Sequence, residues 1–283
     1  MGKLFVVPTP IGNLGDITKR AVEVLGDCDL IAAEDTRVTK NLLNHLNIKK
    51  NIISYHKFNE ATRKNELIKK LKEDDFDICL VTDAGTPCIS DPGYFLVREA
   101  IENDISVIGL PGASAVTTAL SVSGIKTDEF AFFGFLPGKK SALIKKLSEI
   151  KENSVRTFVL YESPRRIVKL LEAMNDVLPN TYVCVCNDLT KYYEKSYYGN
   201  VPDVILQLKE NEKHEKGEYT VVGRKAKKEE EVEDEFCYEA HVINEMIKRG
   251  VSSKEAISIT AKKLQVPKKD VYKAWVDLKE FME

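Results

Sequence analysis

The sequence predicts an α/β protein of two lobes, the first with a parallel sheet and the second with a mixed sheet, and a small C-terminal helical unit. Four apolar runs break off into polar loops rich in glycine and proline: LFVVPTPIGN from Leu4, ICLVTDAGTP from Ile78, VIGLPGASA from Val107 and FVLYESPRR from Phe158. In open α/β sheets, ligands bind at loops that follow the carboxyl ends of strands. A length of 283 residues also exceeds the usual size of one domain. We therefore predict a composite pocket.

Strand and helix signals alternate through the predicted first lobe, residues 1–112. Asp16 is in position to cap a helix whose apolar face runs from Ile17 to Leu25. Further helical patterns cover 37–46 and 60–73, and another helix is expected to open near Pro92. The apolar runs between them predict five strands, near residues 4–7, 28–34, 51–54, 77–81 and 105–109. Strands that alternate with helices predict a parallel sheet.

The pattern restarts in the predicted second lobe, residues 113–226. A helix is expected at 113–123, followed by strands near 130–136, 156–161 and 181–187 that are separated by helices. The segment KYYEKSYYG then follows a strand with little room for a crossover helix, which predicts an antiparallel pair. The lobe is expected to end in the strand EYTVVGRK, so its sheet is predicted to be mixed.

The C-terminal region begins with an acidic stretch, predicted to be a solvated linker over 227–235 and followed by a helical unit over 236–283. Three helices are expected there, and Ser252 and Glu255 have the spacing of a capping box. The unit resembles a helix-turn-helix, with lysines that could contact nucleic acid at 262, 263, 268, 269 and 273. Dimer packing is the alternative, through Phe236, Ile243, Ile247 and Trp275.

Composition excludes several classes of protein. No segment reaches the roughly 18 apolar residues of a membrane helix, and a strand begins almost at the N-terminus, so we expect a cytoplasmic protein without a signal peptide. The net charge of −2 excludes a globally basic nucleic-acid binder, although 138–151 holds five lysines and one glutamate. The six cysteines form no C-x-x-C pair, and Cys184 and Cys186 are expected on one face of a buried strand. We predict no metal site.

Two loops are the best candidates for ligand binding, because neither PIGNLGD nor GFLPGKKS completes a known glycine-rich nucleotide motif. DAGTP places Asp83 at a strand end, and PGASA places Gly112 and Ser114 at the start of a helix, where free N–H groups accept anions. Each loop by itself could also be an ordinary α/β turn.

Seven segments in order carry a resemblance to a known family: VPTPIGNLGDIT, LIAAEDTR, ISYHKFNE, TDAGTPCISDPGY, LPGASAVTTALSVSG, FFGFLP and YESPRR. Over residues 3–225 the chain resembles the 16S ribosomal RNA cytidine 2′-O-methyltransferases, the ribosomal RNA small subunit methyltransferase I family of the tetrapyrrole-methylase fold group. The resemblance implies a homodimer that uses S-adenosylmethionine to methylate a cytidine ribose in the decoding region of 16S rRNA, as free RNA or in the small ribosomal subunit.

The same resemblance implies which residues bind the cofactor. They lie in DAGTP, in PGASA, in LYESP and at two strand ends of the second lobe: Asp83, Ala84, Gly85, Thr86, Ser114, Ala115, Leu160, Tyr161, Cys186 and Thr220. Four positions depart from the family pattern, because Arg165 stands where histidine is common, Asn187 and Asp188 where Arg-Glu is usual, and Gly138 where a basic residue is common.

Methyl transfer to a ribose hydroxyl requires alignment of donor and acceptor and a group that removes a proton. Glu34 and Asp35 are the candidate bases, with Asn13 and Arg37 orienting the ribose or phosphate, although Asp35 could simply cap a helix and pair with Arg37. RNA contacts are expected from residues of VPTPIGN, ISYHKFNE, the lysine run and YESPRR: Pro10, Gly12, Arg37, Tyr55, His56, Lys139, Lys140, Arg165 and Arg166.

Two other functions stay open at the level of sequence. A methyltransferase of the same fold could act on a small molecule such as a tetrapyrrole, although such a substrate requires neither EDTR nor the C-terminal helices. A non-catalytic RNA-binding protein is the second alternative, although it has no need for DAGTP and PGASA together.

Overall fold

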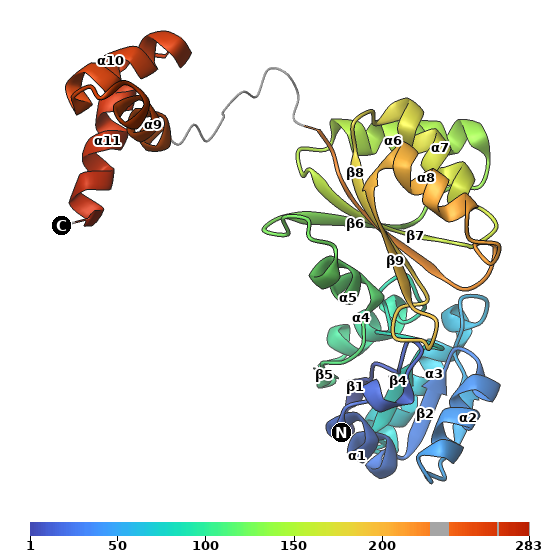
Figure 1. Cartoon of the computed structure of the whole chain (residues 1–283). Coiled ribbons are helices and arrows are strands. Elements are labelled where there is room, and N and C mark those ends of the chain that lie inside the picture. Colours follow the sequence, from blue (N-terminus) through green and yellow to red (C-terminus); the bar gives the residue numbers. More distant parts are fainter. Residues whose placement is uncertain (227–237, 265, 283) are drawn as a thin grey trace. The chain divides into compact units, whose positions relative to one another are not determined.

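The structure, a computed structural model, describes residues 1–226, 238–264 and 266–282. It contains two compact units, Met1–Ala226 and Lys227–Glu283. Both sheets belong to the first unit, and each sheet is covered by helices on its two faces (Figure 1). The predicted acidic linker, 227–235, lies outside the described residues, as does Phe236.

The first sheet is parallel, as the alternation of strands and helices predicted. Its order is β3-β2-β4-β1-β5, and its strands are β1 (Leu4–Val6), β2 (Leu30–Ala33), β3 (Ile52–Ser54), β4 (Ile78–Val81) and β5 (Val107–Gly109). Alternate residues of each strand face opposite sides. Leu30 and Ala32 pack with α3 (Glu60–Glu73) and α4 (Tyr94–Glu102), whereas Ile31 and Ala33 pack with α1 (Lys19–Asp27) and α2 (Thr36–His45).

The start of α1 differs from the prediction. Leu14–Asp16 forms a short 3₁₀ helix, η1, and Asn13 caps it by accepting a hydrogen bond from the N–H of Gly15 at 2.9 Å. The cap of α1 is Thr18, whose Oγ1 accepts from the N–H of Ala21 at 3.1 Å. Asp16 therefore does not cap α1, because the chain makes a separate turn before that helix begins.

The second sheet is mixed, as predicted, with the order β6-β7-β10-β8-β9. β6 (Phe130–Phe135) runs parallel to β7 (Thr157–Glu162), whereas β10 (Tyr219–Arg224), β8 (Tyr182–Asn187) and β9 (Lys195–Asn200) pair antiparallel. Gly223 lies opposite Phe158, and a Cβ at this glycine would come within 2.3 Å of the Phe158 ring.

The helices of the second lobe divide between the two faces of its sheet. One face packs on α6 (Lys140–Glu152), α7 (Ile167–Val177) and α8 (Val201–Lys209), and the other on α5 (Ala115–Val122) (Figure 1). Helix α8 was not predicted, although Pro202 in its first turn is a usual start signal. Cys184 and Cys186 face α5 together with their sulfur atoms 3.6 Å apart, which confirms that they share one buried face.

The C-terminal unit contains α9 (Tyr238–Arg249), α10 (Ser253–Leu264) and α11 (Lys268–Met282). The predicted capping box is present, because the Ser252 hydroxyl donates to Glu255 at 2.9 Å and accepts from its N–H at 3.4 Å. Glu245 is buried and pairs with Lys263 at 2.9 Å and Arg249 at 2.7 Å. Among the described helices of the chain, none combines the length and apolarity that a membrane crossing needs.

Candidate active site

Strand ends from both sheets converge on a cavity of about 440 Å³ within the first unit. The first lobe contributes Glu34 after β2 and the loop after β4, and the start of α5, at the beginning of the second lobe, adds Ser114 and Ala115. The second lobe contributes the end of β7 and the beginning of β10, which meet because these strands are antiparallel and Tyr219 pairs with Glu162. The predicted composite pocket is therefore present.

Backbone contacts hold the DAGTP loop in place. Gly85 has a φ of +87°, a conformation that favours glycine, and its backbone exchanges two hydrogen bonds of 2.9 Å with Thr9. The hydroxyl of Thr86 donates to the carbonyl of Ala113 at 3.0 Å, which ties DAGTP to the PGASA loop. Ser114 is the N-cap of α5 but makes no side-chain cap hydrogen bond, so first-turn amides of α5 have no cap there.

Five carboxylates line the cavity: Glu34, Asp83, Asp91, Glu162 and Glu218. Among its described lining residues there is no lysine, arginine or histidine. Burial, reinforced by the charge of Glu34, raises the pKa of Asp91 to about 7, although an interaction with the Thr82 side chain opposes the shift. Burial also raises the pKa of Asp83 above its ordinary value. The crowding of acids favours a ligand that carries positive charge.

The loop that carries Asp91 has an unusual backbone. Cys88 and Ser90 both have positive φ angles, 71° and 70°, a region that non-glycine residues seldom adopt. Ser90 and Asp91 line the cavity. Backbone strain of this kind tends to occur at functional sites. The sequence reasoning assigned no role to Asp91, although it lies within the segment TDAGTPCISDPGY, because glycine and proline made that segment look like a turn.

Aromatic side chains of the second lobe line one side of the cavity. The ring of Tyr161 packs edge-on against Phe132, with centroids 4.9 Å apart, and lies 5.5 Å from the ring of Phe135. Tyr161 and Phe135 line the cavity. Phe135 was also missed, although it belongs to the segment FFGFLP, because an apolar strand residue is usually a core residue.

Most of the predicted cofactor residues line the cavity. The exceptions are Leu160 and Cys186, which are fully buried and belong to the two cores on opposite faces of the second sheet. Leu160 and Tyr161 point to opposite faces of β7, so Leu160 packs in the core with α7, whereas Cys186 packs in the core beneath α5. The side chains of Leu160 and Cys186 are therefore part of the protein core.

Glu34 and Asp35 have different surroundings. Glu34 lines the cavity and its Oε2 accepts from the Thr82 hydroxyl at 2.5 Å. Asp35 is the N-cap of α2, accepts from the Arg37 N–H at 2.8 Å and pairs with the Arg37 guanidinium at 2.6 Å. The bonds from Arg37 lower the pKa of Asp35 to about 2. The capping and pairing considered from the sequence are both present, and Asp35 does not line the cavity.

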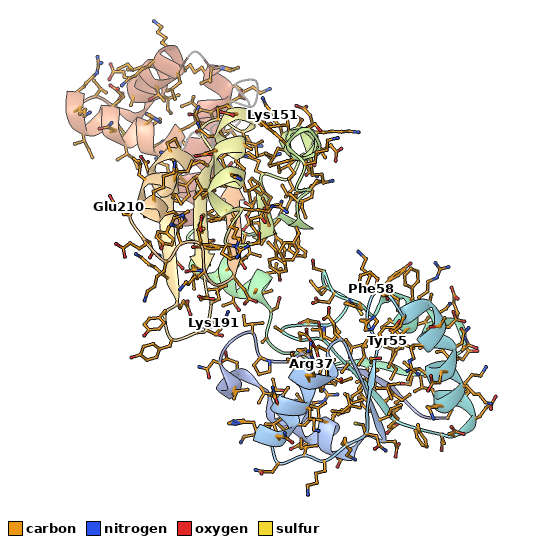
Figure 2. The ribbon with its side chains drawn as sticks, turned by 90° about the vertical axis from the view of Figure 1, so that its right-hand side faces the viewer. Arg37, Tyr55, Phe58, Lys151, Lys191 and Glu210 are labelled. Atoms are coloured by element: carbon orange, nitrogen blue, oxygen red, sulfur yellow. The ribbon has the colours of Figure 1, made fainter. Side chains whose placement is uncertain are left out.

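The residues expected to contact RNA are scattered over the first unit. Tyr55 is completely buried in the first-lobe core, so its ring is not accessible to a nucleotide and the predicted contact is corrected. Phe58, three residues later, is 94% exposed, and Figure 2 places it at the edge of the ribbon, with Tyr55 inside. Lys139, Lys140 and Arg165 are exposed.

Several other expected contacts have structural partners. Arg166 pairs with Glu162 at 3.0 Å and donates to the Leu136 carbonyl at 2.8 Å. Pro10 lines a second recess near Val38, and Gly12 packs closely against Lys191. Asn187, where the resemblance led us to expect a cation, is buried and donates at 3.3 and 3.4 Å to the carbonyls of Lys216 and Glu218.

Comparison with known proteins decides the family. Residues 3–205 match the model of the tetrapyrrole (corrin/porphyrin) methylases. Ribosomal RNA small subunit methyltransferase I of Halalkalibacterium halodurans is 43% identical over 275 residues, which cover 96% of this chain and 93% of that protein. The chain belongs to the ribosomal RNA small subunit methyltransferase I family.

Other relatives agree with this family. The Bacillus subtilis protein of the same name is 40% identical over 279 residues, which cover 97% of this chain and 94% of that one. A crystal structure of uroporphyrin-III C-methyltransferase from Thermus thermophilus, complexed with S-adenosyl homocysteine, has a TM-score of 0.52 at 14% identity and covers 78% of this chain and 97% of that one. This last similarity concerns the fold, and the family assignment makes the protein a methyltransferase, as predicted.

Proposed function

We propose that the protein transfers a methyl group from S-adenosylmethionine to the ribose 2′-oxygen of a cytidine in the decoding region of 16S rRNA, in the cytoplasm. The observation that carries this proposal is the cavity, a ligand-sized space lined by five carboxylates and, among the described lining residues, by no cationic side chain. Glu162 and Glu218 pair with Arg166 and Lys191, so the charge argument rests on Glu34, Asp83 and Asp91. S-adenosylmethionine carries a sulfonium and an ammonium group, so the charge of the cavity suits it.

The residues present fit the cofactor. Asp83 and Glu34 offer carboxylates for its positive charge, and the backbone N–H groups at the start of α5, near Ser114 and Ala115, can donate hydrogen bonds to its carboxylate. Tyr161 and Thr220 offer a partly apolar wall for the adenine. Once bound, S-adenosylmethionine supplies an electrophilic methyl group on a sulfonium.

The protein must orient the ribose and accept its proton. A general base works best when its pKa lies near the working pH, and Asp91 has a pKa of about 7 in the cavity. Asp35 was the first candidate, but its carboxylate is held by Arg37 at a pKa of about 2 and is a weak proton acceptor. We therefore favour Asp91 as the base and assign Asp35 the positioning of Arg37, a side chain that is 88% exposed.

The choice of RNA over a tetrapyrrole rests on the relatives. Proteins at 40–43% identity over nearly the whole chain are named ribosomal RNA methyltransferases. The tetrapyrrole enzyme of similar fold shares 14% of its sequence with this chain, which supports a common fold. We also propose that the protein works as a homodimer, which sedimentation measurements would test.

The decisive experiment uses labelled S-adenosylmethionine and small ribosomal subunits from cells that lack this methylation. We expect one labelled nucleotide whose 3′ phosphodiester resists alkali, because a 2′-O-methyl group blocks that cleavage. Free 16S rRNA, offered in parallel, distinguishes the two forms of the acceptor. A methyl group on a base would overturn the 2′-O assignment, and labelling of a tetrapyrrole with none of the RNA would overturn the proposed substrate.

A further inference from the structure

We propose that Tyr192 and Tyr193, at the tip of the hairpin between β8 and β9, form a stacking platform for an unpaired RNA base that lies outside the cavity. This inference rests on the proposed RNA substrate. The two side chains are 92% and 77% exposed. Their rings pack edge-to-face, with centroids 4.9 Å apart and an interplanar angle of 86°. The pair therefore presents aromatic surface to solvent.

The platform is joined to the rim of the cavity. Leu189, just before the tip, lines the cavity. Lys191 pairs at 2.9 Å with Glu218, which also lines the cavity. The stem of Lys191 lies against Gly12, where an added Cβ would come within 2.5 Å of its Cγ. An RNA strand that places one ribose in the cavity therefore has the platform within reach of a neighbouring nucleotide.

Hydrogen bonds give the tip a defined shape. The N–H of Thr190 donates to the Glu194 carboxylate at 2.7 Å, and the N–H groups of Lys191 and Glu194 close two turns at 3.0 Å. Lys191 also pairs with Asp188 at 2.7 Å. Because the backbone that carries the tyrosines is already ordered, binding a base costs less conformational entropy than it would on a floppy loop.

The surroundings favour RNA over a protein partner. Charged side chains flank the rings, and the ammonium of Lys213 lies 5.6 Å from the centre of the Tyr193 ring. Lys195 lies over Tyr197 at 4.9 Å. Lysine and glutamate are depleted in protein interfaces, whereas aromatic rings beside lysines are typical of single-stranded RNA sites. Figure 2 shows the labelled Lys191 in the second lobe, where this tip begins.

The test compares the double variant Tyr192→Ala/Tyr193→Ala with Tyr192→Phe/Tyr193→Phe, using undermethylated small subunits. Stacking is worth about 1–3 kcal/mol per base, so the alanine variant should raise KM for the subunit about fivefold or more. We expect kcat and the affinity for S-adenosylmethionine to stay unchanged, because neither ring lines the cavity. The phenylalanine variant keeps the rings and should restore KM.

Tyr182→Ala is the matched control, because this tyrosine is 41% exposed at the opposite end of β8. An unchanged KM in the alanine double variant would overturn the platform while leaving the proposed function intact. A change in sedimentation of that variant, with unchanged KM, would assign the tyrosines to a contact between protein copies instead. Failure of the wild-type protein to methylate RNA would overturn the proposed function, and this inference with it.

Discussion

Replacing Asp91 by asparagine tests the assignment of the base. Asparagine keeps the size of the side chain but cannot take up the proton, and general-base catalysis contributes about 10²–10⁴-fold to a rate. Because burial and the charge of Glu34 raise the pKa of Asp91 to about 7, the wild-type kcat/KM should fall about tenfold for each pH unit below 7. At pH 6 about one eleventh of the carboxyl is ionised.

The assay is methyl transfer to the small subunit between pH 5.5 and 9, with kcat and kcat/KM for the donor measured separately. The pH profile of kcat should have its inflection at a lower pH than the profile of kcat/KM, because the bound sulfonium favours the ionised form of the Asp91 carboxyl. Asp35→Asn is the control, since a carboxyl with a pKa of about 2 is ionised over the whole range and removing it should leave the inflection in place. The turnover of Asp35→Asn should fall because Arg37 loses the carboxylate that positions it, whereas the affinity for the donor should be retained.

Stability gives an independent check that Asp91→Asn is folded. An acid whose pKa is raised from 3.8 to about 7 keeps its proton in the folded state, so stability falls as pH rises between these values. Asp91→Asn removes this penalty, so at pH 8 the variant should unfold at a higher temperature than wild type, whereas at pH 4 the two unfolding temperatures should differ little. A folded variant with near wild-type turnover, or one that retains the inflection near pH 7, would refute the assignment.

Three further predictions follow from the contacts of individual residues. Asp83→Asn keeps the oxygen that accepts from the Asp35 N–H but removes one negative charge from the cavity. Calorimetry should therefore show that S-adenosylmethionine binds about tenfold or more weakly. Unchanged binding would exclude Asp83 from the cofactor site. Asn13→Ala removes the cap of η1 and should weaken methylation of the subunit several-fold, whereas calorimetry should show unchanged binding of the donor. Weakened donor binding with unchanged methylation at saturating donor would place Asn13 with the cofactor. Gly223→Ala should lower the unfolding temperature by the equivalent of about 1–3 kcal/mol or more, because its Cβ would meet the Phe158 ring; wild-type stability would mean that the ring yields easily.

The sequence by itself determined the elements and the order of the loops. Apolar runs of four to six residues that end in glycine and proline marked strands such as β4 and β7, because turn chemistry and hydrophobic alternation are local properties. The resemblance placed DAGTP and PGASA at one site, and the parallel pairing of β4, β1 and β5 explains why these loops meet. The family and the fold class were therefore predictable before any coordinates.

Tertiary structure decided which side chains face the cavity and how they titrate. Asp91 follows two residues at positive φ, Cys88 and Ser90, and its raised pKa depends on burial and on the charge of Glu34, a residue far away in sequence. Tyr55 is buried under α3 and α4 although its sequence neighbours are polar, whereas Tyr192, also a tyrosine among polar neighbours, is 92% exposed. Burial and charge depend on contacts between distant segments, and a local pattern does not contain them.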